Sequence, residues 1–130
     1  MSPRRKSSRD TAIEFTQRSL ADLREIERYS VKKWGRSTAD KYLDEIAVAL
    51  DRLRDHPEIL RLEPDFAPGL YFYRVKKHVL VCDFQAQTVI VLTVIHTSMD
   101  VPARLLELEP QLVAEAQFLH DKLRKQSRQD

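Results

Sequence analysis

The sequence predicts an α+β fold: a small twisted antiparallel sheet with an N-terminal helical hairpin packed on one face (β-α-α-β-β-β) and an additional C-terminal helix. Three observations lead to this prediction. Residues 19–56 hold two apolar patterns of helical period separated by one glycine, residues 70–95 hold three short apolar runs, and residues 111–125 return to a helical period. The 130 residues suit one domain with a core of its own.

The first helix of the predicted hairpin begins at Ser19 and ends at Gly35. Ser19 is a suitable N-cap, and Asp22 stands three residues later, where a carboxylate can reach back to the N–H of the cap. The residues expected to face the core are Leu20, Leu23, Ile26 and Trp34, with Ser30 filling the turn between them. Gly35 stops the helix, because glycine enters a positive-φ conformation without a Cβ clash.

The second helix follows directly, with Ser37 as its predicted N-cap and Asp40 at the third position after it. Its apolar residues recur at spacings of three and four, as in a helix that lies on a core: Ala39, Tyr42, Leu43, Ile46, Leu50 and Leu53. His56-Pro57 ends the helix, because a proline disfavours helical geometry in the residue before it.

Four segments have the pattern of a β-strand. Residues 11–17 alternate, with Ile13 and Phe15 on one side. After a proline-rich loop over residues 57–69, three further strands are predicted at residues 70–76, 78–84 and 88–95. The connections between these three are short enough for hairpins, and the last run is apolar on both faces, as expected of a central strand.

The two ends of the chain differ from its middle. Residues 1–10 are predicted to be a basic flexible tail without an apolar pattern. Residues 107–130 are predicted to be an amphipathic extension, with a helix over residues 111–125 behind Pro110. Its apolar stripe must cover the open face of its own sheet, a second copy of the chain, or the groove of a partner. The first is favoured, because such a stripe rarely stays exposed.

Composition indicates a cytoplasmic globular protein. The formal net charge is +2, the hydrophobic fraction is 42% and the charged fraction is 32%. The longest apolar run, residues 89–95, is too short to span a bilayer, and no apolar stretch of a secretory signal follows the basic N-terminus. Cys82 is the one cysteine, which fits a reducing compartment and a buried thiol.

Four local patterns, in this order, resemble the ParE branch of the RelE/ParE toxins of bacterial type II toxin–antitoxin modules. They are SLADLREIERYSVKKWG (19–35), ADKYLDEIAVALDRLRDHP (39–57), GLYFYRVKKHVLVCDF (69–84) and VIVLTVIHTSMDVPARLL (89–106). The resemblance covers about residues 11–106, the predicted toxin domain. It implies the predicted fold, a cognate antitoxin as partner, DNA gyrase as target, and a part in plasmid stabilisation. RelE-like relatives instead cut messenger RNA on the ribosome. No cofactor and no membrane are implied.

The choice between gyrase and messenger RNA depends on the candidate site. Metal-independent RNA cleavage needs a base, an acid and cations at the scissile phosphate, and Arg74 and His96 can imitate part of such a site. The residues predicted to bind the target or the antitoxin are Arg74, Lys76, Lys77, His78, His96 and Asp100. No histidine or aromatic residue lies between Thr97 and Leu106, where the ribonuclease branch often has one, and the Asp100 carboxylate would repel a phosphate.

This departure favours a gyrase poison without chemistry of its own. A metal-independent endoribonuclease and a non-toxic binding relative are the alternatives. For His96 and Asp100 a structural role is favoured over a functional one. They are predicted to form a hydrogen-bonded pair at a joint, with Met99 and Pro102, where the chain leaves the sheet.

Other conspicuous residues are predicted to serve the core. Tyr29, Trp34 and Tyr42 belong to the helical hairpin and are expected to be buried there. The aromatic residues of strand 70–76 could form an RNA-stacking platform, but packing against a neighbouring element is favoured. A zinc site from His78, Cys82 and His96 lacks a fourth ligand at a recognisable spacing, so no metal site is predicted.

Overall fold

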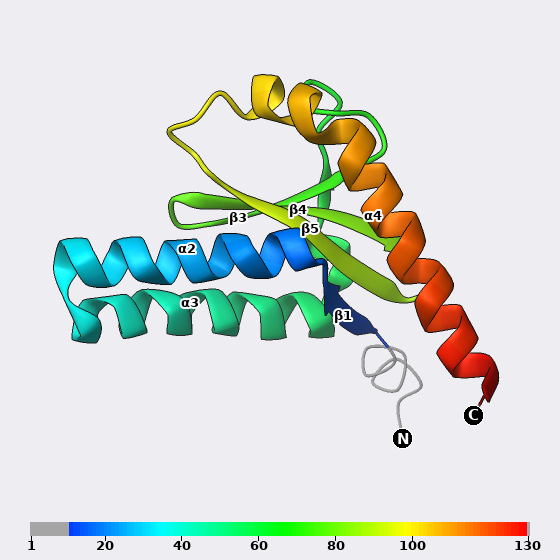
Figure 1. Ribbon diagram of the computed structural model, residues 1–130, viewed down its shortest axis with the longest axis horizontal. Coiled ribbons are helices and arrows are strands. Elements are labelled where there is room, and N and C mark those ends of the chain that lie inside the picture. The colour runs from blue at the N-terminus through cyan, green and yellow to red at the C-terminus, as the bar shows by residue number, and fades with distance from the viewer. Residues whose placement is uncertain (1–10, 130) are drawn as a thin grey trace.

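The computed structural model describes residues 11–129, with side chains through residue 126, so the predicted tail over residues 1–10 lies outside the described residues. The elements in chain order are β1 (Ala12–Phe15), α2 (Gln17–Trp34), α3 (Arg36–Asp55), the 3-10 helix η1 (Pro57–Ile59), β2 (Arg61–Leu62), β3 (Tyr71–Val75), β4 (His78–Gln85), β5 (Thr88–His96) and α4 (Val101–Gln129). They form three layers, with the sheet between the helical hairpin of α2 and α3 and the single helix α4 (Figure 1). The predicted fold class is confirmed.

The sheet has five strands in the order β1-β5-β4-β3-β2. Strands β3, β4 and β5 form the predicted antiparallel meander, and β2 adds a short antiparallel edge within the predicted loop. Strand β1 pairs with β5 in parallel, with Ile13 opposite Val89, so the sheet is mixed rather than wholly antiparallel. A parallel pair needs a long crossover connection, and the helical hairpin and the meander together supply one. Local sequence pattern carries no information about this direction.

A β-bulge in β5 decides which of its side chains face each layer. The pairing of β5 with β4 skips one residue at Leu92. Before the skip Val91 faces the helical hairpin, and after it Val94 does, three residues later instead of two. The same shift places His96 on the hairpin side of the sheet, against His78 of β4.

Helix α2 begins at Gln17, earlier than predicted, and its N-cap is Thr16 rather than Ser19. The Thr16 Oγ1 accepts a hydrogen bond from the Ser19 N–H (3.1 Å) and donates one to the carbonyl of Leu92 (2.9 Å). Ser19 is fully buried within the first turn. The prediction chose the wrong capping residue because threonine and serine both suit an N-cap, and only the contact with β5 distinguishes them.

Asp22 also has a different role from the predicted capping one. Its Oδ2 accepts hydrogen bonds from Thr93 Oγ1 (2.6 Å) and from the Val94 N–H (3.0 Å). Strand β1 ends at Phe15, opposite Val91, so the following part of β5 has no strand beside it on that edge. Asp22 therefore satisfies a backbone group of β5 that the sheet leaves unpaired.

The turn between the helices centres on Gly35, whose φ of 90° confirms the predicted need for glycine. Ser37 makes no capping bond, contrary to the prediction, since α3 begins at Arg36 with Gly35 as its N-cap. The Arg36 guanidinium instead joins Glu27 of α2 (2.9 Å) to Asp40 of α3 (3.3 Å), and these hydrogen bonds raise the pKa of Arg36. As predicted, α3 ends before His56-Pro57.

Each face of the sheet has its own apolar core. The hairpin-side core is formed by Ile46, Ala49, Leu53, Leu60, Val75, Leu80, Cys82, Val89, Val91 and Val94. The α4-side core is formed by Ala67, Leu70, Phe72, Val79, Val81, Ile90, Leu92, Ile95, Val101, Leu105, Leu108, Leu112 and Ala116. The aromatic side chains of β3 divide between them, with Phe72 on the α4 side and Tyr71 and Tyr73 on the hairpin side, so the favoured packing role is confirmed.

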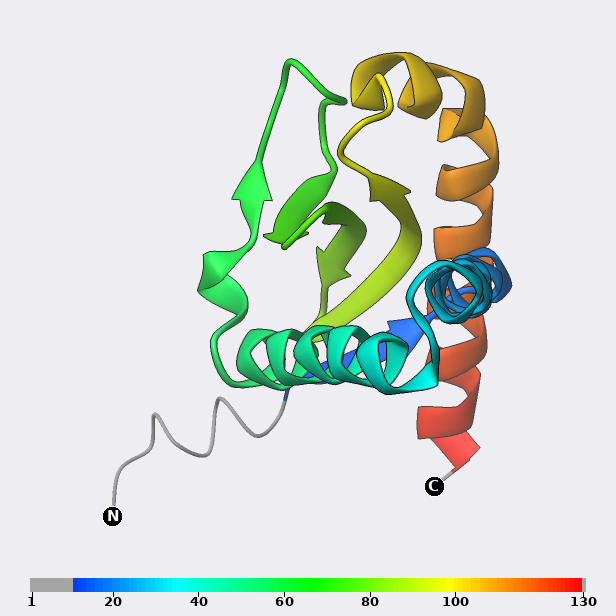
Figure 2. The ribbon, with the colours of Figure 1, turned by 90° about the vertical axis from the view of Figure 1, so that its left-hand side faces the viewer.

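Helix α4 covers the open face of its own sheet, which was the favoured prediction. It starts at Val101 rather than behind Pro110, so the predicted helix was too short. Pro110 cannot donate to the carbonyl four residues earlier, and Figure 2 shows the first turns of α4 bending across one end of the sheet before the helix runs down its face. The hairpin packs on the opposite face of the sheet, where it covers the other apolar core.

Two polar contacts add to the apolar contacts of α4. Arg18 of α2 forms a bidentate ion pair with Glu115, with Nε to Oε1 and Nη2 to Oε2 distances of 3.2 and 3.1 Å. His120 is buried, and its Nε2 lies 2.5 Å from the Asp83 carboxylate of β4. These contacts hold the C-terminal half of α4 against both the hairpin and the sheet.

Candidate functional site

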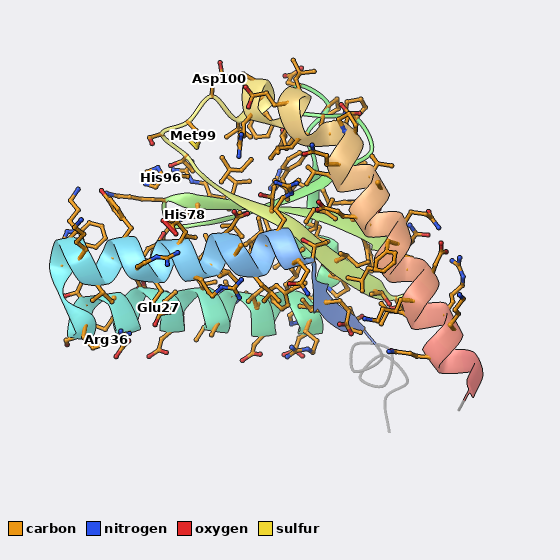
Figure 3. All side chains as sticks on the ribbon, in the orientation of Figure 1. Glu27, Arg36, His78, His96, Met99 and Asp100 are labelled. Atoms are coloured by element: carbon orange, nitrogen blue, oxygen red, sulfur yellow. The ribbon has the colours of Figure 1, made fainter. Side chains whose placement is uncertain are left out.

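The candidate site is an open pocket of about 480 Å³ between the helical hairpin and the ends of β4 and β5. The hairpin contributes Asp22, Glu25, Ile26, Tyr29, Ser30, Trp34 and Tyr42, and the sheet contributes Lys77, His78, Val94, His96 and Ser98. Figure 3 shows His78 and His96 at the end of the sheet, beside the part of the hairpin that extends beyond it.

The two histidines occupy opposite positions on adjacent strands. His78 begins β4 and His96 ends β5, and the antiparallel register pairs them directly. Their rings meet edge to face, with 4.9 Å between centroids. Tyr42 of α3 lies on the other side of His78, and its hydroxyl is 2.5 Å from His78 Nδ1. Side chains from α3, β4 and β5 therefore come together around His78.

Burial controls protonation in this group. Burial, and then the nearby His96, lower the pKa of His78 to about 4, so that the His78 ring is neutral at neutral pH. Burial also raises the pKa of Tyr42, so its hydroxyl keeps its proton. His78 and Tyr42 thus offer neutral hydrogen-bonding groups rather than a charged acid–base pair.

The outer wall of the pocket is aromatic and exposed. Tyr29 and Trp34 keep 56% and 49% of their surface accessible, so the prediction that they are core residues was wrong. Trp34 continues the apolar stripe of α2, but the hairpin extends beyond the end of the sheet, where there is no core to bury it (Figure 1). The rings of Tyr29 and Trp34 meet edge to face at 6.1 Å, and the Lys33 ammonium lies 5.5 and 5.3 Å from their centroids.

The chain leaves the sheet beside this pocket. His96 Nδ1 accepts a hydrogen bond from the Ser98 N–H (3.0 Å), and Asp100 Oδ1 accepts one from the Ala103 N–H (3.1 Å) at the start of α4. Each residue thus stabilises the joint separately, and the predicted bond between His96 and Asp100 is absent from the hydrogen bonds of residues 11–126. Met99 lies between them, 49% exposed, on the connection labelled in Figure 3.

Of the remaining predicted site residues, one lines this pocket and two lie outside it, together in a neighbouring pocket. Lys77 lines the pocket with His78 and His96. Lys76, on the other side of the β3–β4 turn, pairs with Glu45 of α3 (3.4 Å). Arg74 donates a hydrogen bond from Nε to the Lys76 carbonyl (3.3 Å). Its side chain does not line the pocket, because alternation along β3 places Arg74 on the same face of the sheet as Phe72, which is the α4 side. Arg74 and His96 are therefore not brought together.

Cys82 lies within the hairpin-side core and is fully buried, as predicted, and this burial raises the pKa of its thiol. Over the part of the chain that the structure describes, no three His, Cys, Asp or Glu side chains are placed to hold a metal ion. Within the same residues, no helix is long and apolar enough to cross a membrane.

Four further residues belong to this site without having been predicted there: Tyr29, Trp34, Tyr42 and Ser98. Tyr42 stood on the apolar stripe of α3 and resembled any other core residue. One signal was available: a lysine stands between two aromatic residues at the predicted end of α2, in the string YSVKKWG, close to where the helix must leave the sheet.

Comparison of the sequence with known proteins identifies relatives of this chain. The sequence profile of a family described as the ParE toxin of type II toxin–antitoxin system, parDE, matches residues 13–101. The toxin ParE of Escherichia coli is 28% identical over 98 residues, which are 75% of this chain and 95% of that protein.

One solved structure shows the same fold. A structure described as the chromosomal ParDE toxin–antitoxin system from P. aeruginosa superposes with a TM-score of 0.60 at 17% identity, over 68% of this chain and 97% of that chain. The RelBE2 toxin–antitoxin complex of Mycobacterium tuberculosis gives a TM-score of 0.47 at 20% identity, over 66% of this chain and 96% of that chain. The profile match spans β1 to the start of α4 and includes every residue of the pocket. The chain therefore belongs to the ParE toxin family of type II toxin–antitoxin systems.

Proposed function

We propose that this protein acts in the cytoplasm as a toxin that binds and inhibits DNA gyrase, and that a cognate antitoxin holds it inactive. Membership of the ParE family is the observation that carries the proposal. The similar P. aeruginosa structure is described as a toxin–antitoxin system, which supports an antitoxin partner here. The gyrase target follows from the resemblance of the four sequence motifs to the gyrase-poisoning branch.

The arrangement of the pocket supports binding over RNA cleavage. Cleavage without a metal needs cations at the phosphate and an acid and a base that exchange a proton near neutral pH. Arg74 lies outside the pocket, and His78 has a pKa of about 4. Asp22 and Glu25 add carboxylates to the pocket wall, where they would repel a phosphodiester. A ribonuclease mechanism therefore has less support than a binding function.

The exposed surface around the pocket suits a protein partner. Tyr29 and Trp34 of the pocket wall are about half exposed, and so is Met99, which follows the pocket residue Ser98 in the chain. Aromatic side chains and methionine are enriched at protein interfaces relative to the remaining surface. The end of the hairpin extends beyond the sheet, so a partner can contact it without disturbing either core (Figure 1).

Controlled expression in a bacterial host tests the activity. A gyrase poison stabilises broken DNA, so expression should stop growth, induce the DNA-damage response and leave cleaved plasmid in a reaction with purified gyrase. Normal growth at a high level of folded protein would contradict the proposal. Cuts in ribosome-bound transcripts, with supercoiling unaffected, would identify a ribonuclease instead.

Two matched substitutions connect the activity with the pocket. Trp34→Ala removes an exposed ring at the rim, and Val48→Ala removes an exposed apolar side chain of α3 away from the pocket. Trp34→Ala should weaken gyrase inhibition at least tenfold, the effect of losing an interface residue worth about 1.4 kcal/mol or more. Val48→Ala should leave inhibition unchanged. Equal inhibition by both variants would place the gyrase-binding surface elsewhere.

The antitoxin is tested by co-expression with the product of the neighbouring reading frame. A cognate antitoxin should restore growth and co-purify with the toxin. Restored growth without a stable complex would contradict direct neutralisation.

A further inference from the structure

The hydrogen bonds of the two pocket histidines determine where their protons lie. His96 Nδ1 accepts from the Ser98 N–H, so the proton of the neutral ring is on Nε2. His78 Nδ1 faces the Tyr42 hydroxyl, whose oxygen also accepts from the Lys77 N–H (3.4 Å). A phenol is a better donor than a neutral imidazole, and a bare imidazole nitrogen is the better acceptor. We therefore assign the Tyr42 hydroxyl as donor to Nδ1, which puts the His78 proton on Nε2 as well.

Both Nε2–H groups belong to rings that line the pocket. Neither Nε2 has a hydrogen-bond partner among residues 11–126, whereas every buried side-chain nitrogen or oxygen in those residues has one. The two Nε2 atoms are therefore accessible to solvent, and both rings line the same pocket. The structure thus presents two adjacent imidazole donors, on rings 4.9 Å apart, without acceptors.

The surroundings of these donors define what can bind them. The Lys77 side chain lies on the same wall, and Ile26, Val94 and Trp34 supply an apolar wall beside it. Of the two carboxylates in the pocket, Asp22 already accepts two hydrogen bonds from β5 and Glu25 pairs with Arg28 on the surface of α2. Neither of them contacts the histidines. The complementary ligand has one anionic acceptor next to an apolar group.

We propose that an aspartate or glutamate side chain of the antitoxin binds in this pocket, with its carboxylate on the Nε2–H groups of His78 and His96 and an apolar neighbouring residue against Trp34 and Val94. The identity of the occupant rests on the proposed function. A peptide fits better than a nucleic acid. The phosphodiester backbone of a nucleic acid continues on both sides of the bound phosphate, and its further negative charges would be repelled by Asp22 and Glu25.

Titration of the purified, isotopically labelled toxin tests the site directly. The probe is 3-phenylpropionate, a carboxylate with an apolar body, and the control is 3-phenylpropionamide, which has the same body without the charge. At neutral pH, 3-phenylpropionate should move the ¹⁵N signals of both Nε2 atoms. The amide should bind at least about tenfold more weakly, since hydrogen bonds to charged groups are the stronger ones. Equal binding of acid and amide, or immobile Nε2 signals, would overturn the proposal.

Inorganic phosphate and a single-stranded oligothymidylate are the other arms of this titration. Both should bind more weakly than 3-phenylpropionate. Tighter binding of the oligonucleotide, with movement of the same Nε2 signals, would assign the pocket to nucleic acid and overturn the peptide assignment.

Substitution of the histidines gives an independent check. A glutamine amide can place an N–H near the position of the imidazole Nε2–H, whereas leucine offers no donor. His96→Gln should keep most of the affinity for 3-phenylpropionate, and His96→Leu should lose about tenfold or more. His78→Gln and His78→Leu should repeat the pattern. Unchanged affinity in both folded leucine variants would overturn the proposal, and the native-protein titration decides the matter if a leucine variant does not fold.

The antitoxin complex identifies the occupant. In toxin co-purified with its antitoxin, both Nε2 signals should already be moved, and 3-phenylpropionate should have no further effect. Undiminished probe binding to the complex would show that the antitoxin does not occupy the pocket. The titration of the isolated toxin needs neither growth arrest nor gyrase, so failure of the carboxylate site and failure of the proposed function give different results.

Discussion

The two faces of the sheet are covered in different ways. On one face α4 covers the core, and its own Leu105 and Leu112 are fully buried against the strands. On the other face the helical hairpin covers the strands but extends past their end, where it leaves an open pocket with His78, His96 and the exposed Trp34. The comparison separates side chains that hold the fold together from side chains that we propose contact a partner.

The difference between the two faces also corresponds to the limits of the family profile match. The ParE profile matches residues 13–101, so the open pocket belongs to the shared part of the fold, and nearly all of α4 lies beyond the match. Helix α4 nevertheless buries a core as large as the one under the hairpin. The covered face therefore depends on an element that the profile does not include.

The largest expected effect is a substitution under α4. Leu112→Ala removes a fully buried side chain and should lower the free energy of unfolding by about 2–5 kcal/mol, through lost apolar burial and the cavity left behind. Leu106→Ala on the same helix is the control, because Leu106 is 74% exposed, and its effect should stay within about 0.5 kcal/mol. Urea denaturation measures both. Similar small losses would show that α4 contributes little to stability.

The next effect is a pH dependence that comes from the open face. The pKa of His78 is about 4 in the folded protein and near 6.5 when unfolded. Between these values the unfolded chain binds a proton that the folded protein does not, so stability should fall as the pH is lowered through this interval. Because His78 is only half buried, we expect a loss of about 1–2 kcal/mol. His78→Gln should remove this component from the pH dependence of urea denaturation; an unchanged slope would contradict it.

A smaller effect on stability is expected at the joint where the chain leaves β5 and enters α4. Asp100→Ala removes the acceptor for the Ala103 N–H and should lower stability by about 1 kcal/mol, the usual value of an N-cap. Asp100→Ser, which keeps a capping oxygen, should restore most of it in thermal unfolding. Toxicity should persist in both variants. Loss of toxicity in Asp100→Ala at full stability would make Asp100 a functional residue.

The smallest effect on stability is expected at the rim of the pocket. Trp34→Ala should change the free energy of unfolding by less than about 1 kcal/mol, because the ring is half exposed and outside both cores. A loss of about 3–5 kcal/mol, as for a buried tryptophan, would remove the distinction between the two faces.

Much of the fold could be predicted from short-range pattern. The apolar periods of α2, α3 and α4, the three strands of the meander and the glycine turn at Gly35 all appear in the sequence and in the structure. The helical and strand periods involve residues that are close together in the sequence, so they can be recognised without knowledge of the tertiary fold. Of the predicted site residues, Lys77, His78 and His96 line one pocket, while Arg74, Lys76 and Asp100 lie outside it, and their functional role stays a prediction.

Tertiary structure alone decided how these elements meet. The parallel pairing of β1, the bulge at Leu92 and the bond from Thr93 to Asp22 depend on residues far apart in the chain, 71 positions in the last case. The meeting of Tyr42 with His78 spans 36 positions. A helical period shows which side of α2 is apolar, but not where the sheet beneath it ends. Trp34 is exposed for this reason: the sequence determined its side of the helix, and the length of the neighbouring strands determined that nothing covers it.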